Sequence, residues 1–168
     1  VVNRFGPDDE RRIYGLPGTF LFTGLFFNRD LFQQAGLPPR APKDWKEMLE
    51  FAKAIKAIKP KSRPIFLVGG ADASWNLMSF LWSAGADAVV ETQSGTWRAA
   101  FDTPEAVAAY EFYYQLVEAD RLAVRSGKLN SPEELQKTGM FFGYVGDALR
   151  FDPEKFGFGP VPKGPTGL

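Results

Sequence analysis

Hydrophobic residues occur along this chain in short runs that alternate with polar segments. The first run covers residues 20–28, and its length and aromatic content favour a strand that is covered on both faces. Gly24 inside this run is expected at a bulge or at a close approach to a neighbour. Runs at 65–68 and 140–145 predict two more buried strands, and residues 156–162 predict an edge strand limited by its prolines.

The segments between these strands have the spacing of hydrophobic residues that is typical of helices. Asp44 followed by Glu47 is a capping-box pattern, and apolar residues then recur at helical spacing until Pro60 ends the run. The segment 73–84 is apolar on most sides, which predicts a deeply buried helix. The remaining predicted elements are helices at 30–35, 104–119 (capped by Asp102) and 131–137, and a hairpin at 89–99. Strands that alternate with helices predict an α/β layer fold.

The composition is that of one folded domain with no preference for charged partners. The chain has 168 residues, of which 45% are hydrophobic and 15% aromatic, and this excludes a disordered protein. Its 20 basic and 20 acidic side chains leave no net charge that would attract nucleic acid or an anionic membrane. No run of about 18 apolar residues is present, so no membrane span is predicted. The first residues carry neither Met nor a signal peptide, from which we expect a mature or cut piece of a longer protein.

The chain contains no cysteine and no histidine. Disulfides and thiolate catalysis are therefore excluded, and the commonest metal ligand and general base are missing. Gly69–Gly70 follows a predicted strand, but no complete phosphate-binding pattern surrounds it, so a plain turn is favoured. The sequence predicts no metal and no cofactor.

Carboxylates and aromatic residues remain as candidates for a site. Asp87, Glu91 and Asp147 could serve a carbohydrate-active enzyme, although nothing in their spacing shows the pair of carboxyls, about 5 to 9 Å apart, that glycoside hydrolysis requires. Trp75 opens a helix just after a strand, at the carboxyl edge where open α/β sheets bind ligands. An indole there could stack on a sugar ring, with Asn76 as hydrogen-bond partner, or it could equally be part of the core.

The other tryptophans are predicted to be structural. Trp45 and Trp82 lie within apolar stripes of helices and are expected in the core. Trp97 lies on the predicted hairpin and is expected to be a packing residue.

Several segments together resemble the family 1 extracellular solute-binding proteins, the maltose-binding-protein-like receptors of ABC importers. Residues 27–39 (FNRDLFQQAGLPP) with 42–49 (PKDWKEML) are similar to the family signature, and so are 80–87 (FLWSAGAD), 101–106 (FDTPEA) and 156–164 (FGFGPVPKG). Their order and spacing extend over nearly the whole chain.

The resemblance implies two α/β lobes that close on a ligand like a clamp and then dock on membrane permease subunits. Residues 1–168 are then one helix-rich, three-layer lobe of a type II periplasmic-binding-protein fold, with hinge crossings near 14–18 and 158–164. This would be the C-terminal lobe, separated from the N-terminal lobe of the same parent chain. The resemblance also implies an extracytoplasmic location, either periplasmic or at the cell surface with a lipid anchor.

The resemblance also implies ligand positions. Trp75 falls where family members place an aromatic residue that stacks on sugar, and Ser74 and Asn76 flank it. In the segment that contains Met140, the chain departs from the family: Tyr144 replaces a glycine, and a glycine at 146 replaces the stacking tryptophan. Tyr144 is therefore expected to form a second wall of the site.

The leading hypothesis is a non-enzymatic lobe that binds a small polar solute, most simply a sugar or oligosaccharide. Phe20, next to the first hinge segment, is an additional candidate ligand residue. Because an isolated lobe lacks half of the contacts, its affinity is expected to fall by on the order of a thousandfold. The alternatives are the carbohydrate-active enzyme and a stand-alone interaction domain that pairs through an exposed apolar face.

Overall fold

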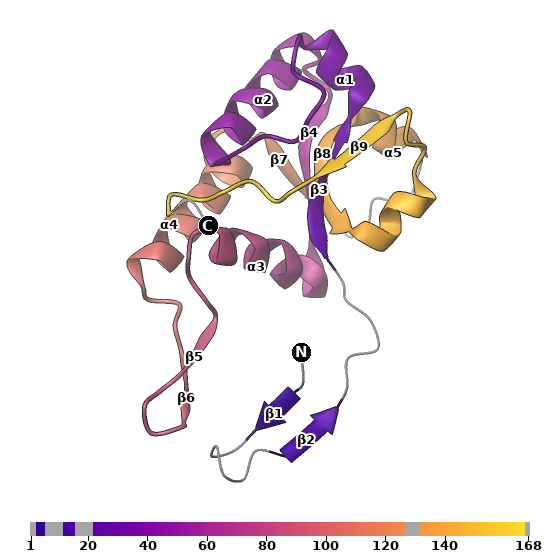
Figure 1. The fold of residues 1–168 in the computed structure, drawn as a ribbon. Coiled ribbons are helices and arrows are strands. Elements are labelled where there is room, and N and C mark those ends of the chain that lie inside the picture. The colour runs from indigo at the N-terminus through magenta and orange to yellow at the C-terminus, as the bar shows by residue number, and fades with distance from the viewer. Residues whose placement is uncertain (1–2, 6–11, 16–21, 127–131, 167–168) are drawn as a thin grey trace.

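A five-stranded mixed sheet forms the centre of the protein (Figure 1). The computed structural model describes residues 3–5, 12–15, 22–126 and 132–166. The strand order is β7-β4-β8-β3-β9. The strands are β3 (Thr23–Asn28), β4 (Arg63–Val68), β7 (Ala123–Ser126), β8 (Thr138–Tyr144) and β9 (Phe156–Gly159). Strand β4 runs parallel to β7 and β8, whereas β3 runs antiparallel to β8 and β9.

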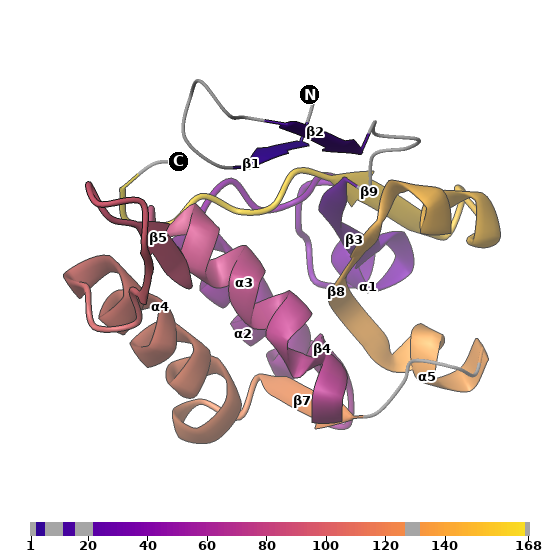
Figure 2. The same ribbon diagram turned by 90° about the horizontal axis from the view of Figure 1, so that it is seen from below.

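Helices cover both faces of this sheet (Figures 1 and 2). Helices α2, α3 and α4 lie on one side, and α5 with the 3₁₀-helix η3 lies on the other. The helices are α1 (Arg29–Gln34), α2 (Trp45–Ile58), α3 (Ala73–Ser83), α4 (Pro104–Tyr114) and α5 (Pro132–Lys137). Two 3₁₀-helices, η1 (Gly70–Asp72) and η3 (Val145–Arg150), and a π-helical turn, η2 (Gln115–Ala119), complete the helical elements of the described residues.

Two small hairpins lie outside the sheet. Strands β1 (Asn3–Phe5) and β2 (Arg12–Gly15) pair antiparallel, as do β5 (Val89–Glu91) and β6 (Trp97–Ala99). The β5–β6 hairpin extends away from the body as an arm (Figure 1).

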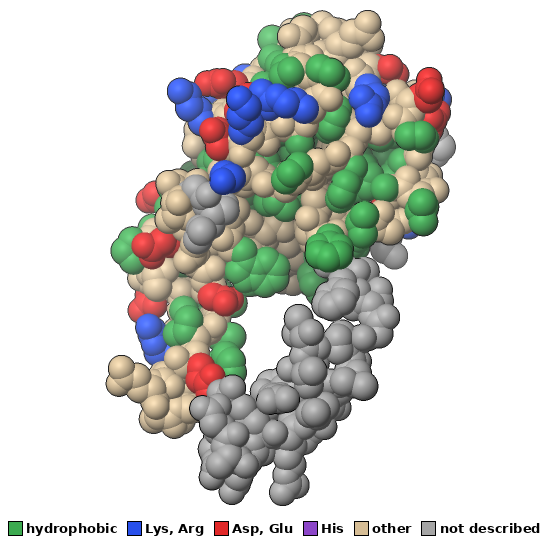
Figure 3. All heavy atoms as spheres, in the orientation of Figure 1, with side chains coloured by type: hydrophobic (Ala, Val, Ile, Leu, Met, Phe, Trp, Pro, Cys, Tyr) green, Lys and Arg blue, Asp and Glu red, His purple; other side chains and the backbone are tan. Residues whose placement is uncertain are grey.

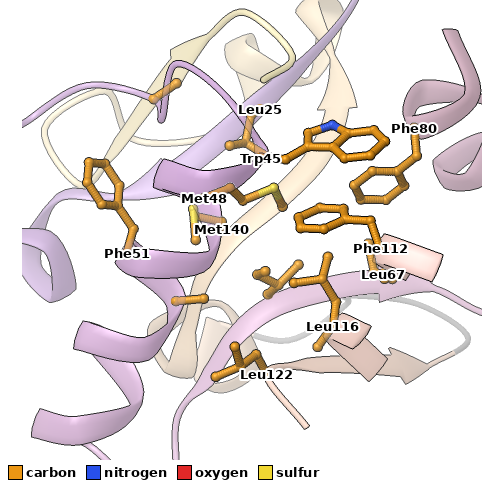
Figure 4. Close-up of a cluster of buried hydrophobic side chains, with 14 of the residues drawn as sticks. Leu25, Trp45, Met48, Phe51, Leu67, Phe80, Phe112, Leu116, Leu122 and Met140 are labelled. Atoms are coloured by element: carbon orange, nitrogen blue, oxygen red, sulfur yellow. The ribbon is translucent and has the colours of Figure 1, made fainter. Parts of the chain in front are cut away.

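Alternate side chains of the central strands divide the core into two clusters, because successive residues of a strand point to opposite faces. The larger cluster contains Leu25, Leu67 and Met140, which pack with the side chains of α1 to α4 (Figure 4). The smaller cluster forms on the opposite face around Phe26 and Phe141, whose rings stack at 5.0 Å. The prediction of a strand covered on both faces is therefore confirmed for β3.

Gly24 is required by close packing at the start of β3. A Cβ atom at this position would lie 2.3 Å from the Phe158 ring of β9 and 2.6 Å from the Gly159 carbonyl oxygen. The predicted close approach is confirmed.

The predicted α/β fold is confirmed, and several details of the prediction are wrong. Strand β7 was not predicted, because it is short and two of its described side chains are exposed. Thr103 rather than Asp102 caps α4, where its Oγ1 accepts a hydrogen bond from the Ala106 N–H at 3.2 Å. The cap falls on Thr103 because Pro104 is the first helical residue.

Another error concerns α3, which is not buried on all sides. Trp75 and Trp82 are 57% and 53% exposed, although Phe80 and Leu81 are buried. The two indoles are seven residues apart and therefore share one face of the helix. Trp82 is therefore not a core residue. Trp97 is 62% exposed on β6 and is not a packing residue either.

Candidate functional site

A cavity of about 370 Å³ lies at the carboxyl ends of β4 and β8. Because β3 is antiparallel to β8, its first residue, Thr23, reaches the same edge. The η1–α3 segment follows β4, and η3 follows β8, so both connections contribute side chains to the cavity. The cavity is lined by Thr23, Phe66, Val68, Asp72, Trp75, Asn76, Phe142, Gly143, Tyr144 and Asp147. This is the edge of the sheet at which the sequence predicts a ligand site.

Two aromatic rings form a corner in this cavity. The Trp75 indole and the Tyr144 ring have centroids 6.2 Å apart, and their planes meet at 83°. Trp75 is the third residue of α3, and Tyr144 is the last residue of β8. Each ring therefore presents apolar surface to the cavity in a different direction, which suits a ligand with C–H groups on more than one side.

Asn76 has a structural contact as well as a place in the cavity. Its side chain is buried, and its Oδ1 accepts a hydrogen bond from the Val68 N–H at 2.6 Å. This bond ties the first turns of α3 to the end of β4. It thereby fixes the position of the neighbouring Trp75 relative to the sheet.

Two carboxylates also line the cavity. Asp147 Oδ2 accepts a hydrogen bond from the Tyr144 N–H at 3.1 Å, and Oδ1 accepts one from Arg150 at 3.4 Å. This arrangement holds the turn between β8 and η3 that carries Tyr144. Asp72 is exposed at the start of α3 and makes no side-chain cap there. None of the lining residues that the structure describes is Lys or Arg.

Three of the predicted ligand residues are brought together in this cavity: Trp75, Asn76 and Tyr144. Ser74 is exposed next to Trp75 and is not part of this lining. Phe20 lies outside the described residues. Sequence reasoning missed Asp72 as a lining residue, although its place four residues after β4 is a signal that could have found it.

The three carboxylates considered for catalysis do not gather in this cavity. Asp147 lines it, whereas Asp87 follows the far end of α3 and accepts a hydrogen bond from Trp82 Nε1 at 3.3 Å. Glu91 is exposed on the β5–β6 arm. The enzyme alternative therefore has no support from their placement.

A second hollow of about 440 Å³ lies at the start of α2. Its aromatic residues are Trp45 and Phe112, whose rings stack on each other at 4.5 Å with planes 8° apart. Because the rings cover each other's faces, this hollow offers less aromatic surface to a ligand than the Trp75–Tyr144 corner.

The described parts of the chain give no sign of a metal centre or a membrane span. Among residues 3–5, 12–15, 22–126 and 132–166, no three His, Cys, Asp or Glu side chains are grouped as ion ligands. Over the same ranges, no helix combines the length and the hydropathy needed to cross a bilayer.

Comparisons with known proteins identify the family. Residues 2–168 match the family model "Bacterial extracellular solute-binding protein", so the chain belongs to this family, as the sequence motifs indicated. Binding proteins from Brucella abortus and Brucella suis are 26% identical to it over 168 residues. These alignments cover 93% of this chain and 39% of each relative, so the chain spans about two fifths of the length of the curated relatives it matches.

Solved structures agree with this fold assignment. UgpB from Mycobacterium tuberculosis, in complex with glycerophosphocholine, superposes with a TM-score of 0.76 at 22% identity, covering 96% of this chain and 42% of UgpB. A cyclic alpha-maltosyl-1,6-maltose binding protein from Arthrobacter globiformis superposes with a TM-score of 0.67 at 27% identity, covering 85% of this chain and 37% of that protein. Maltose-bound MalE3 from T. maritima gives a TM-score of 0.66 at 25% identity, with 87% and 39% coverage. The fold is that of a type II periplasmic-binding-protein lobe, as predicted.

Proposed function

We propose that this chain is a ligand-binding lobe of an ABC-importer substrate-binding protein and that it binds a small polar solute. The observation that carries the proposal is the cavity at the carboxyl edge of the sheet, walled by Trp75 and Tyr144 and furnished with polar groups. An aromatic wall beside a few hydrogen-bonding groups is the usual composition of a small-molecule site.

A sugar or oligosaccharide is the solute that this arrangement and the comparisons support best. The indole of Trp75 offers a flat apolar face to the C–H groups of a pyranose ring, and carboxylates accept hydrogen bonds from hydroxyls. Structural relatives include proteins whose structures contain maltose, α-D-tagatose and laminaribiose.

The lobe is proposed to work as half of a clamp. The partial coverage of relatives is consistent with a parent protein in which residues 1–168 form the C-terminal lobe, with hinge crossings near 14–18 and 158–164. The remaining lobe would close over the Trp75–Tyr144 corner, and ABC permease subunits would receive the closed form. We place the parent protein outside the cytoplasm. In this role the protein binds and releases its solute without chemical change.

The proposal is tested by titrating the ¹⁵N-labelled chain with maltose and with D-tagatose. The chain has 4 tryptophans, and each contributes one indole N–H resonance. We expect the Trp75 resonance to shift progressively, with saturation in the millimolar range because half of the contacts are absent.

The matched variants are Trp75→Ala and Trp97→Ala, which each remove one exposed indole. The first should abolish the response of the backbone resonances near Tyr144, and the second should leave it unchanged. A response confined to Trp97, or none with either sugar, would contradict a sugar site at this cavity. Micromolar affinity of this chain alone would contradict the half-clamp.

A further inference from the structure

The Trp75–Tyr144 corner has a geometry that suits an organic cation as well as a sugar. Its two rings meet nearly at a right angle, at 83°, with centroids 6.2 Å apart. A rounded group placed in such a corner touches two aromatic surfaces at once, whereas a flat sugar ring stacks on only one. The electron-rich faces of Trp and Tyr attract alkylated ammonium groups, and proteins recognise such groups with cages of aromatic side chains.

The charged side chains around the Trp75–Tyr144 corner are negative, which suits a cationic ligand group. Asp72 and Asp147 both line the cavity, and no lining residue that the structure describes is positively charged. Arg150 is the described cation in contact with one of these carboxylates, at 3.4 Å from Asp147, and its side chain is 78% exposed, so solvent screens it. The Asp72 side chain makes no cap hydrogen bond at the start of α3.

The same charges work against an anionic ligand group. The amino end of α3 would by itself favour an anion through its free N–H groups. The carboxylate of Asp72 lies at that end of the helix and opposes this attraction. Figure 3 shows a row of Lys and Arg side chains on the upper part of the body, over α2, whereas hydrophobic side chains lie along its lower edge, at α3.

We infer that the solute bound at this cavity carries an alkylated ammonium group, which sits in the Trp75–Tyr144 corner opposite Asp72 and Asp147. This inference rests on the proposed function, because it assigns a chemical class to the ligand of that same site. A solute that combined such a cation with hydroxyl groups would use both the aromatic corner and the polar groups of the cavity.

The inference is tested with choline chloride and its neutral isostere, 3,3-dimethylbutan-1-ol, which have the same shape and differ in charge. The ¹⁵N-labelled 168-residue chain is titrated with each compound up to about 100 mM, with sodium chloride at equal concentration as the ionic-strength control. We expect choline to shift the Trp75 indole resonance and the Tyr144 amide with at least about fivefold higher affinity than the isostere.

Two variants that each remove one negative charge distinguish an effect of the cavity from an effect of the overall surface charge. Asp72→Asn removes a carboxylate that lines the cavity, and Asp102→Asn removes an exposed one that does not. Choline affinity should fall about threefold or more with the first variant and stay unchanged with the second.

The outcomes distinguish this inference from the proposed function. Saccharide binding at Trp75 without choline binding would overturn the cation assignment and leave the sugar-binding lobe in place. Choline binding without saccharide binding would support the cation and exclude the sugar class. Equal binding of choline and its isostere would show that only apolar contact matters and would overturn the inference.

Discussion

The starts of helices α2 and α3 carry similar residues and have opposite structural roles. Each helix has an aspartate at its N-cap position and a tryptophan close behind it. At α2, Asp44 Oδ1 accepts a hydrogen bond from the Glu47 N–H at 2.8 Å, and Trp45 is buried, with 7% of its surface exposed. At α3, Asp72 makes no side-chain cap and Trp75 is 57% exposed.

The partners of the two indoles explain this difference. Trp45 stacks on Phe112, and its Nε1 donates a hydrogen bond to Ser83 Oγ at 3.1 Å. Trp75 has an edge contact with Tyr144 and otherwise faces the cavity. An aromatic residue after a helix cap is therefore structural where helices cover it, and it is available for a ligand where a strand end leaves an opening beside it.

The largest expected effect that tests this contrast is the loss of the Trp45 side chain. Trp45→Ala should lower the free energy of unfolding by about 3–5 kcal/mol, because it removes a buried ring and leaves a cavity between α2 and α4. Urea denaturation followed by far-UV circular dichroism measures it. Ser83→Ala keeps the ring, removes the acceptor for Trp45 Nε1 together with the hydrogen bond that Ser83 Oγ donates to the Phe80 carbonyl oxygen, and should cost about 1 kcal/mol. A loss below 1 kcal/mol for Trp45→Ala would show that the two helix starts are not structurally different.

A smaller effect on the free energy of unfolding is expected at Glu47, which stabilises the start of α2 through an ion pair and hydrogen bonds. Its carboxylate accepts two hydrogen bonds from the Arg40 guanidinium, both at 2.7 Å, and one from the Lys43 N–H. The Arg40 hydrogen bonds, more than any other cause, lower the pKa of Glu47 to about 2. Since Arg40 is partly exposed and solvent weakens the pair, we expect Glu47→Gln to cost about 1–2 kcal/mol at pH 7.

The lowered pKa of Glu47 also fixes the direction of its pH dependence. A glutamate in the unfolded chain has a pKa near 4.5, so the unfolded state takes up the proton first as the pH falls. The stabilisation from Glu47 is therefore complete above about pH 5, declines below pH 4.5 and is lost near pH 2. Urea titrations from pH 7 to pH 3 should show a smaller loss of stability in Glu47→Gln than in the unchanged chain. Glu50→Gln, an exposed carboxyl on the same helix, is the control and should follow the unchanged chain.

Much of the sheet and part of the site could be predicted from the sequence. The runs at 65–68 and 140–145 place two strands whose carboxyl ends meet, and Trp75 and Tyr144 follow from that rule together with the family resemblance. The cap at Asp44 was also predictable, because it depends on residues within one helical turn. The second half of that capping box was not, because Glu47 bonds to the Lys43 N–H rather than to its own cap residue.

The exposure of some side chains and their grouping in the cavity could not be predicted, because both depend on contacts between distant segments. The burial of Trp45 was predicted correctly, whereas Trp75 and Trp82 lie within an equally apolar stretch and are both exposed. Trp82 was predicted in the core and is 53% exposed, on the same face of α3 as the exposed Trp75. Asp72 was missed as a lining residue, and Asp147 was considered only as a catalytic carboxylate, because their place in one cavity requires η1 and η3 to meet at one edge of the sheet.

The smallest expected effect on stability is the one that most directly defines the site. Trp75→Ala should change the free energy of unfolding by less than about 1 kcal/mol, because it removes an exposed ring with one edge contact. Trp97→Ala removes an equally exposed indole from the β5–β6 arm and should have a similarly small effect in urea denaturation. If Trp75→Ala cost as much as Trp45→Ala, the indole would be part of the core, and the reason for assigning it to a ligand would disappear. A near-neutral result would mean that a large aromatic side chain occupies this position without stabilising the fold, which is what a binding surface requires.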